Sequence, residues 1–445
     1  MTFRFDELET EPVSQEEVDR VYADLHARLD VCPDVRGAVA IVESWDQFRR
    51  KLDTWGALAH IRFTQDTTDE ARRQKRDEYD ERAPKLTEAA IEFQRKLLDS
   101  PHRPALEREL GEYVFRLWEC SILTYDPAIE AETIEESKLS SRYDEILGSA
   151  EIEFRGENYN LSGLGKFFED SDRDTRHEAE QARWNWFASK GDELDDVFDK
   201  LVKLRHAKAK KLGFKSYTEL AYKGLSRTDY DESDVARYRD AVRTHVVPIG
   251  TKIRTAQANQ LGVDPLMFWD EAVADPQGNP APHAEHDALV EAGQRMFDEI
   301  GHGLDDFFRM MIDSRLTDLG ARKGKAVGGY CSDIATERVP FIYANFNGTK
   351  GDVEVFTHEM GHAFQCYEAR EAFPMDLWWP TAEAAEIHSM SLEFLTWPQM
   401  EHFFDGDGAD RFRRIHLTES LLFLPYGVAV DHFQHLVYAE PEASP

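Results

Sequence analysis

The chain has 445 residues, of which 41% are apolar and 31% are charged, a balance that fits a soluble globular protein and excludes a disordered chain. Its 86 acidic residues outnumber 53 basic ones, and the formal net charge is −33. A nucleic-acid-binding protein normally carries a basic surface, so that class is excluded as well.

The acidic excess is combined with few lysines, since the 53 basic residues comprise 18 Lys and 35 Arg. Such a surface stays hydrated at high salt, which hints at a salt-loving source, although an ordinary acidic cytosolic protein fits equally well. The first twenty residues lack the basic and apolar regions of a secretory signal, and no run of about 18 apolar residues follows. The four cysteines are far apart and form no CxxC pair. We expect a cytoplasmic protein without a membrane span.

Helical patterns run through most of the chain. Ser14–Asp30 begins with a serine cap, has Glu17 in the capping-box position and places apolar residues on one stripe. Thr68–Ser100 predicts a long charged helix that breaks at Pro84, and Asp192–Gly213 predicts one that ends in basic residues and a glycine. The length allows two or three domains or one elongated helical body. The fold class is therefore mainly α.

One region resembles β structure. Lys325–Asp333 and Val339–Thr349 are rich in aromatic and branched residues and are bounded by glycine and proline. They come directly before the next predicted helix. The sequence therefore predicts a short sheet that leads into that helix.

The stretch "VFTHEMGHAFQ", Val355–Gln365, has two histidines four residues apart and a glutamate after the first. If this stretch is helical, His358 and His362 lie one turn apart on the same face, and both can reach one Zn²⁺. Glu359 is rotated by about a third of a turn, so it can stand beside the metal as a general base. HExxH also arises by chance, and the alternative is two surface histidines on an amphipathic helix.

A catalytic zinc site needs a third protein ligand. Thr381–Trp397 predicts a helix that places Glu386 and Glu393 on one face. Carboxylates on an otherwise apolar helix are costly unless they are paired or bind a metal. We expect Glu386 to be the third ligand, with Glu383 as the weaker candidate. Glu393 either holds a ligand histidine in its proper tautomer, or is an exposed carboxylate or part of an ordinary salt bridge.

Four stretches together resemble a known family: "GKAVGGYCSD", "PFIYANFNGTKGDVEVFTHEMGHAFQCYEAR", "AAEIHSMSLEFLTWP" and "LPYGVAVDHFQHLVY". In their order and spacing, the chain resembles the oligoendopeptidase F type of zinc metallopeptidase, a relative of thimet oligopeptidase. The resemblance implies one zinc ion per chain on His358, His362 and Glu386, with Glu359 as the base. It also implies a mainly helical, two-lobed body, with a small sheet beside the HExxH helix and a deep channel that admits short peptides.

The resemblance also bears on the lobes and on the substrate. We expect an N-terminal helical lobe over residues 1–195 and a zinc metallopeptidase catalytic lobe over residues 196–445. The segment "FIYANF" is implied to be an edge strand that pairs with the substrate backbone. The expected substrate-binding residues are Tyr343, Ala344 and Asn345.

The end of the chain raises a further expectation. In this family a donor to the oxyanion comes from a His/Tyr-bearing segment near the C-terminus. The chain ends at Ala439–Pro445 and is expected to lack that segment. Tyr330, Tyr343 and Tyr426 have no basis in the sequence for replacing it.

We therefore expect a zinc-dependent metalloendopeptidase that hydrolyses internal bonds of short oligopeptides. One alternative is a zinc carboxypeptidase or dipeptidyl carboxypeptidase of the same HExxH-plus-Glu type, which would need a positive group to capture the substrate carboxylate. Another is an inactive, truncated peptide-binding zinc module. The sequence indicates neither an oligomeric state nor a cleavage-site preference.

Overall fold

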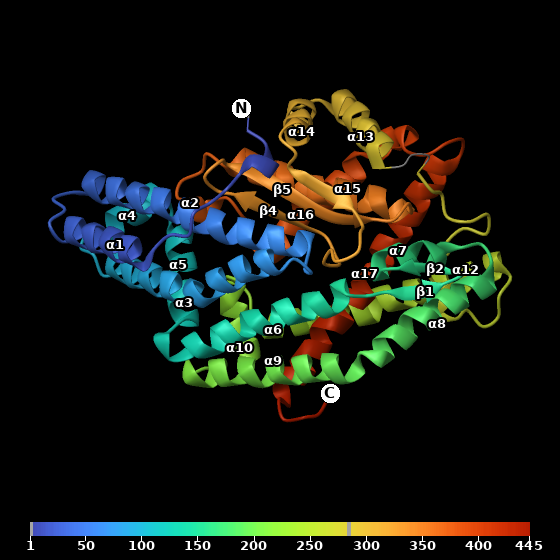
Figure 1. Cartoon of the computed structure of the whole chain (residues 1–445), viewed down its shortest axis with the longest axis horizontal. Coiled ribbons are helices and arrows are strands. Elements are labelled where there is room, and N and C mark those ends of the chain that lie inside the picture. The colour runs from blue at the N-terminus through green and yellow to red at the C-terminus, as the bar shows by residue number, and fades with distance from the viewer. Residues whose placement is uncertain (1–2, 283–285) are drawn as a thin grey trace.

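Helices form most of the protein, as the patterning predicts. The computed structural model describes residues 3–282 and 286–445. The first five helices gather at one end of an elongated body, and the sheet lies nearer its middle, where α2 (Val35–Gln65) contacts β4 (Tyr330–Ile334) (Figure 1). These five are α1 (Gln15–Asp30), α2 (Val35–Gln65), α3 (Glu70–Leu98), α4 (Arg103–Leu110) and α5 (Glu112–Thr124).

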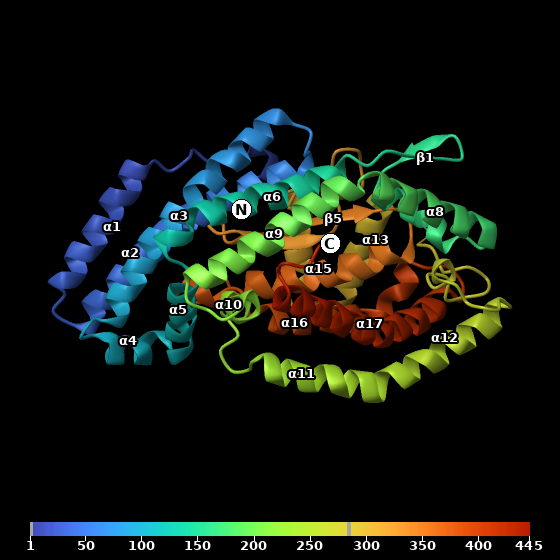
Figure 2. The same ribbon diagram turned by 90° about the horizontal axis from the view of Figure 1, so that it is seen from below.

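A second group of helices follows, with a two-stranded hairpin of β1 (Ile152–Phe154) and β2 (Glu157–Tyr159) among them. In this group α11 and α12 are joined by a π-helical segment and lie along one edge of the body (Figure 2). The helices of the group are α6 (Glu130–Gly148), α7 (Leu161–Leu164), α8 (Arg173–Ser189), α9 (Gly191–Lys211), α10 (Tyr217–Gly224), α11 (Glu232–Ala241) and α12 (Val247–Leu261).

The predicted helix boundaries agree with the structure at most ends. The Ser14 hydroxyl accepts a hydrogen bond from the backbone N–H of Glu17 at 3.2 Å, so the predicted cap of α1 is confirmed. The predicted break at Pro84 is wrong, because α3 continues through it. Pro84 is buried in α3, and that packing outweighs the single backbone hydrogen bond that a proline cannot make.

The predicted sheet is present and has a third strand that the sequence did not indicate. Its order is β3 (Thr317–Gly320), β5 (Val339–Phe346), β4 (Tyr330–Ile334), with β5 parallel to β3 and antiparallel to β4. The expectation that "FIYANF" is an edge strand is therefore wrong, since β5 is paired on both sides. Its nearly continuous apolar run is typical of a strand buried on both faces. The edge strands are β3 and β4.

The two largest hydrophobic cores lie at the sheet and among the first helices. One surrounds the sheet and includes residues of α13 (His286–Ile300), α14 (Leu304–Asp313) and α15 (Lys350–Ala369), and the other lies among α1 to α5. Helix α2 belongs to both, with Ile61 in the first core and Trp45 in the second. The expected lobe boundary near residue 195 stays a prediction.

The chain continues into two helices that complete the region around α15, namely α16 (Ala382–Leu395) and α17 (Gly408–Ala439). Within the part of the chain that the structure describes, no helix combines the length and the apolar character needed to cross a membrane. The cytoplasmic location stays a prediction.

Candidate metal centre

The HExxH helix, α15, begins where β5 ends. The carboxylate of Asp352, in its first turn, accepts hydrogen bonds from the backbone N–H groups of Asn347 at 2.9 Å and Gly348 at 2.7 Å. An acidic group at this end of a helix also suits the helix dipole. Helix α15 packs against both β5 and α16. The strand, the turn and the helix therefore form one connected support for the two histidines.

Helices α15 and α16 cross closely at a glycine. A Cβ atom on Gly361 would lie 2.6 Å from Cα of Ser389 and 2.7 Å from the backbone oxygen of His388. Only glycine permits such an approach, because the atoms in the way belong to the backbone. The crossing places Glu386, one turn before Ser389, over the HExxH face. Gly361 was not singled out in the sequence, although a glycine inside a helix costs about 1 kcal/mol relative to alanine and usually has a packing reason.

Three donor atoms converge at this crossing. Nε2 of His358 lies 3.2 Å from Oε2 of Glu386, and Nε2 of His362 lies 3.6 Å from the same oxygen. The donor atoms of the three residues all lie within 4.8 Å of one another. Atoms that share one tetrahedral zinc ion at about 2.0–2.1 Å stand about 3.3 Å apart. The spacing, and the set of two imidazoles and one carboxylate, therefore fit a zinc ion.

Glu359 lies beside this group without joining it. Its side chain is 7% exposed, and Oε2 is buried without a hydrogen-bond partner among the described residues. Burial raises the pKa of Glu359 to about 7, helped by the charge of Glu386 and opposed by that of His358. A carboxylate with a pKa near 7 suits proton transfer at neutral pH. A buried oxygen without a partner is expected where a water molecule or a substrate is meant to bind.

A chain of hydrogen bonds orients His358. Its Nδ1 lies 2.6 Å from Oε1 of Glu393, whose Oε2 lies 2.5 Å from Nε2 of His416. The indole N–H of Trp397 donates to Nδ1 of His416 at 3.0 Å. Because an indole can only donate, Nδ1 of His416 accepts and Nε2 carries the proton that faces Glu393. Glu393 is thereby left to accept from His358, which frees Nε2 of His358 to bind a metal.

Charge at the site favours a cation. Burial alone would lower the pKa of His358, but hydrogen bonds with Glu386 and Glu393 outweigh it and raise the pKa to about 10. The hydrogen bond from His358 in turn lowers the pKa of Glu386 to about 2. The two carboxylates thus stabilise one positive charge beside the imidazole, and either a proton or a metal ion can supply it.

His416 was not singled out in the sequence. It lies on α17, 23 residues after Glu393, so no local spacing connects it to the motif. His416 is 4% exposed and its ring stacks on Phe412. Its place beside Ile415 and four residues after Phe412, on the apolar stripe of α17, is the sequence signal that could have pointed to it.

Three other residues singled out in the sequence, Glu383, Tyr330 and Tyr426, are not among the three donors. Glu383 forms an ion pair with Arg227 and does not join the three donors. The hydroxyl of Tyr330 lies 2.6 Å from the Thr64 hydroxyl. Tyr426, on α17, is 65% exposed.

The three expected substrate-binding residues lie inside the sheet. Tyr343 and Ala344 are fully buried, and the Tyr343 hydroxyl lies 2.6 Å from the backbone oxygen of Ala326. The side-chain amide of Asn345 donates to the backbone oxygens of Ala326 at 2.8 Å and Gly328 at 2.9 Å. The side chains of Tyr343 and Asn345 thus hold the segment that leads into β4.

A cavity of about 580 Å³ opens beside the HExxH face. Its lining includes His358, Glu359, Gly328, Gly329 and Asn345. A Cβ atom on Gly329 would lie 3.5 Å from Oε1 of Glu359, so the start of β4 approaches the carboxylate closely. The cavity thus brings the candidate base together with the glycines that precede β4 and with the last residues of β5.

Comparisons with known proteins agree with this arrangement. A family model described as "Peptidase M3 N-terminal domain" matches residues 5–125, and one described as "Peptidase family M3" matches residues 167–445. No curated protein matched the sequence.

Solved structures extend the likeness over the whole chain. The structure "PZ PEPTIDASE A with inhibitor 2" is 42% identical, with a TM-score of 0.97, and the match covers 99% of this chain and 78% of that one. The structure "Crystal structure of a putative oligoendopeptidase F from Bacillus anthracis str. Ames" is also 42% identical, with a TM-score of 0.97, over 100% of this chain and 81% of that one. An oligoendopeptidase-F from Enterococcus faecium, 17% identical with a TM-score of 0.50 over 97% of this chain and 76% of that one, shares the fold alone.

Proposed function

The chain belongs to peptidase family M3 and is a metalloendopeptidase of that family, and from this premise we propose that it uses zinc to cut internal peptide bonds of short oligopeptides. The observation that supports the proposal most strongly is the convergence of three donor atoms beside the buried, unpartnered oxygen of Glu359. His358, His362 and Glu386 would hold one zinc ion. When bound, zinc supplies a Lewis acid that polarises the scissile carbonyl and makes water acidic.

Glu359, Glu393 and His416 then have separate roles in the reaction. Glu359 takes a proton from the attacking water through Oε2 and later passes it to the leaving amine. Its burial excludes competing water and raises its pKa, which favours the uptake of a proton. Glu393 and His416 act on His358 as positioning residues, because they fix its tautomer and ring orientation.

We propose that β4, rather than β5, pairs with the peptide backbone. Strand β4 lies at an edge of the sheet, and the glycines before it line the same cavity as Glu359. An extended peptide added to an edge strand gains backbone hydrogen bonds that do not depend on its sequence. Tyr343 and Asn345 then support the substrate indirectly, by holding the segment that leads into β4, and Ala344 is buried between them.

The two-lobed organisation, with a deep channel between residues 1–195 and 196–445, is part of the same proposal. The hydrophobic core among α1 to α5 supports an N-terminal lobe, and helix α2 joins that core to the one around the sheet. A channel of this kind would admit short unfolded peptides and exclude folded proteins. The substrates are therefore expected to be oligopeptides.

The endopeptidase proposal is favoured over a carboxypeptidase by the charges around the site. A carboxypeptidase needs a cation to capture the terminal carboxylate of its substrate. Among the described residues, no Lys or Arg lines the cavity beside Glu359. Arg227, which lines a neighbouring cavity, is already paired with Glu383.

Cleavage of an internally quenched peptide of ten residues tests the proposal. The purified chain is assayed with zinc, with a chelator and as Glu359→Gln, and mass spectrometry locates the cut. We expect an internal cut that the chelator abolishes, and we expect Glu359→Gln to lower kcat by about 10²–10⁴-fold while zinc stays bound. Glu368→Gln, an exposed carboxylate on the same helix, is the matched control. Removal of one or two residues from the C-terminus would favour the carboxypeptidase, and zinc binding without turnover would favour the binding module.

A further inference from the structure

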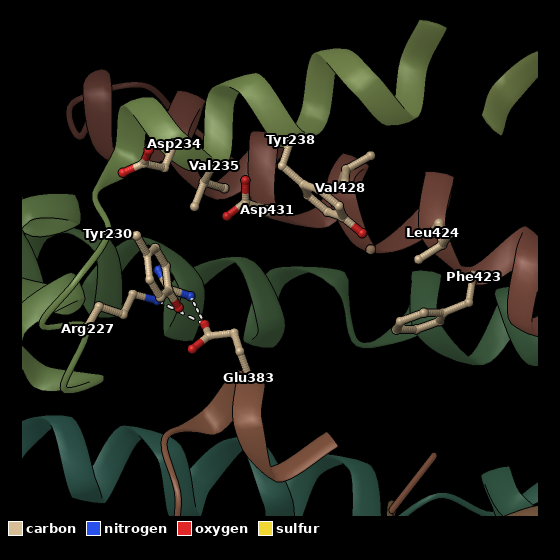
Figure 3. Close-up of a pocket in the computed structure, with 11 residues that line it drawn as sticks. Arg227, Tyr230, Asp234, Val235, Tyr238, Glu383, Phe423, Leu424, Val428 and Asp431 are labelled. Carbon is tan, nitrogen blue, oxygen red and sulfur yellow. Dashed lines mark hydrogen bonds and ion pairs between the residues drawn. The ribbon is translucent and has the colours of Figure 1, made fainter. Parts of the chain in front are cut away.

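A second cavity lies beside the metal centre, between α11 and α17. Its volume is about 450 Å³, within the range of small-ligand sites. We call it the α11–α17 pocket. Aromatic and aliphatic side chains form its walls (Figure 3): Tyr230, Val235, Tyr238, Phe423, Leu424 and Val428.

The charged groups that line this pocket are neutralised by partners of their own. Glu383 accepts hydrogen bonds from Nε of Arg227 at 2.9 Å and from its Nη2, and Figure 3 shows the Tyr230 ring beside this pair. Asp431 pairs with Arg239 at 2.5 Å, and Asp234 pairs with Arg237. A charged ligand would have to displace one of these partners. The pocket therefore suits an uncharged, apolar group.

The pocket adjoins a cleft that reaches the metal centre. Glu383 lines the α11–α17 pocket and also a shallow cleft that includes Glu386. The cleft between them is lined by apolar side chains of α16, among them Ile387, which is 65% exposed. A substrate that reaches Glu386 can thus extend along an apolar surface into the pocket.

The spacing of Glu383 and Glu386 along α16 indicates how far from the metal centre the pocket begins. Glu383 comes three residues before Glu386, a rise of about 4.5 Å along the helix. An extended peptide advances about 3.3 Å per residue. Glu383, at the entrance of the pocket, is therefore about one to two extended residues from Glu386, which places the entrance within about three residues of a bond held at the metal centre.

We propose that the α11–α17 pocket is a specificity site that binds one bulky apolar side chain of the peptide substrate, such as Phe, within three residues of the scissile bond. This inference rests on the proposed function, since it assigns a substrate preference to the same site. The occupant is a substrate side chain because Glu383 forms part of the wall of both the pocket and the cleft that includes Glu386, and because the charged groups of the pocket are already paired.

Gly427 offers a way to fill the pocket without disturbing the fold. It lies on α17 in the pocket wall, and a Cβ atom there would meet only the Phe423 ring, at 3.6 Å. That distance is ordinary van der Waals contact. Leucine is a better helix former than glycine, so Gly427→Leu fills space in the pocket and supports α17.

The experiment compares pairs of quenched peptides that differ only by Phe or Ala at one position, scanned over three residues on each side of the cut. For the unmodified chain with zinc, we expect one position at which kcat/KM favours Phe by about tenfold or more. In Gly427→Leu that ratio falls towards one. Gly224→Leu, at a helix glycine with open space around it, keeps the ratio and serves as the matched control.

Several outcomes would overturn the inference. They are the absence of any Phe preference, a preference that survives in Gly427→Leu, or an equal loss for both peptides. A preference for a free carboxylate that disappears in Arg227→Gln would also overturn it, because it would assign the pocket to an anion. If the unmodified chain cleaves both peptides while the inference fails, the proposed function still holds. If it cleaves neither, the proposed function fails first.

Discussion

Two glycines lie at two places where helices meet, and they have opposite surroundings. At the crossing of α15 and α16, a Cβ atom on Gly361 would collide with backbone at 2.6 Å. Beside α11, a Cβ atom on Gly427 of α17 would make ordinary contact at 3.6 Å, next to a cavity of about 450 Å³. The first glycine lets two helices touch, and the second leaves space between them. A metal site needs fixed distances, whereas a pocket for varied side chains needs room.

The polar contacts are also more closely connected at the α15–α16 crossing than at the α11–α17 pocket. At the first crossing, hydrogen bonds run without interruption from Trp397 through His416 and Glu393 to His358. At the second, the polar contacts are separate ion pairs: Arg239 of α11 with Asp431 of α17, and Arg227 with Glu383 of α16, whose carboxylates are 29% and 45% exposed. Buried, fully paired networks are rigid, while a partly exposed ion pair contributes little. The metal side is therefore expected to be much less tolerant of change.

The largest effect is expected for Gly361→Ala. The added methyl group must push α16 away from α15, which carries Glu386 away from the two histidines. Overpacking of this kind costs about 1–3 kcal/mol, and the stabilisation by bound metal is lost in addition. Zinc stoichiometry and thermal unfolding measure both effects. A variant that binds one zinc ion with unchanged affinity would show that the close crossing is not what assembles the site.

Removal of the metal from the unmodified chain should have the next largest effect. A ligand that binds only the folded state stabilises it by about 2.7 kcal/mol at a concentration of 100 times its Kd. Chelation is therefore expected to lower the melting temperature of the unmodified chain and to leave that of Gly361→Ala unchanged. Equal shifts in the two proteins would mean that zinc binds elsewhere on the chain.

A smaller effect is expected when the hydrogen-bond chain is broken behind the ligand. In Glu393→Gln, the amide can accept from one histidine only, so its NH₂ group faces the N–H of the other. Loss of such an orienting partner typically weakens metal affinity by about 10–100-fold. Competition with a chromophoric chelator measures the change, and His416→Phe should weaken affinity in the same direction. If neither substitution changes the affinity, the chain Trp397–His416–Glu393 has no part in orienting His358.

The contrast between the two helix contacts also explains what could be predicted from the sequence. The two histidines, Glu359 and Glu386 lie within two short helical patterns, so 3.6-residue periodicity was enough to bring them together as candidates. The pairing order of the sheet is set by tertiary contacts, and for that reason the edge strand was assigned to β5 instead of β4. His416 is on another helix, and no local pattern connects it to the motif.

Sequence periodicity also does not predict where a cavity lies. The α11–α17 pocket is formed by residues that are nearly 200 positions apart in the sequence, such as Tyr230 and Phe423. Periodicity predicts which side of a helix is apolar, but it does not predict whether a neighbouring helix fills that side. The clash at Gly361 and the room at Gly427 are visible only when both helices are in place.

The smallest predicted effect has the opposite sign from the first. Gly427→Ala should stabilise the chain by about 0.5–1 kcal/mol, because alanine restricts the unfolded chain and has the higher helix propensity. The measurement is chemical unfolding of the metal-free protein, so that bound zinc does not contribute, with Gly361→Ala measured beside it. A loss of stability at Gly427 would mean that α17 is packed as closely there as α15 is at Gly361. The pocket would then have no room for a substrate side chain. A gain at one glycine and a loss at the other would confirm that the same substitution fills space in one place and forces two backbones apart in the other.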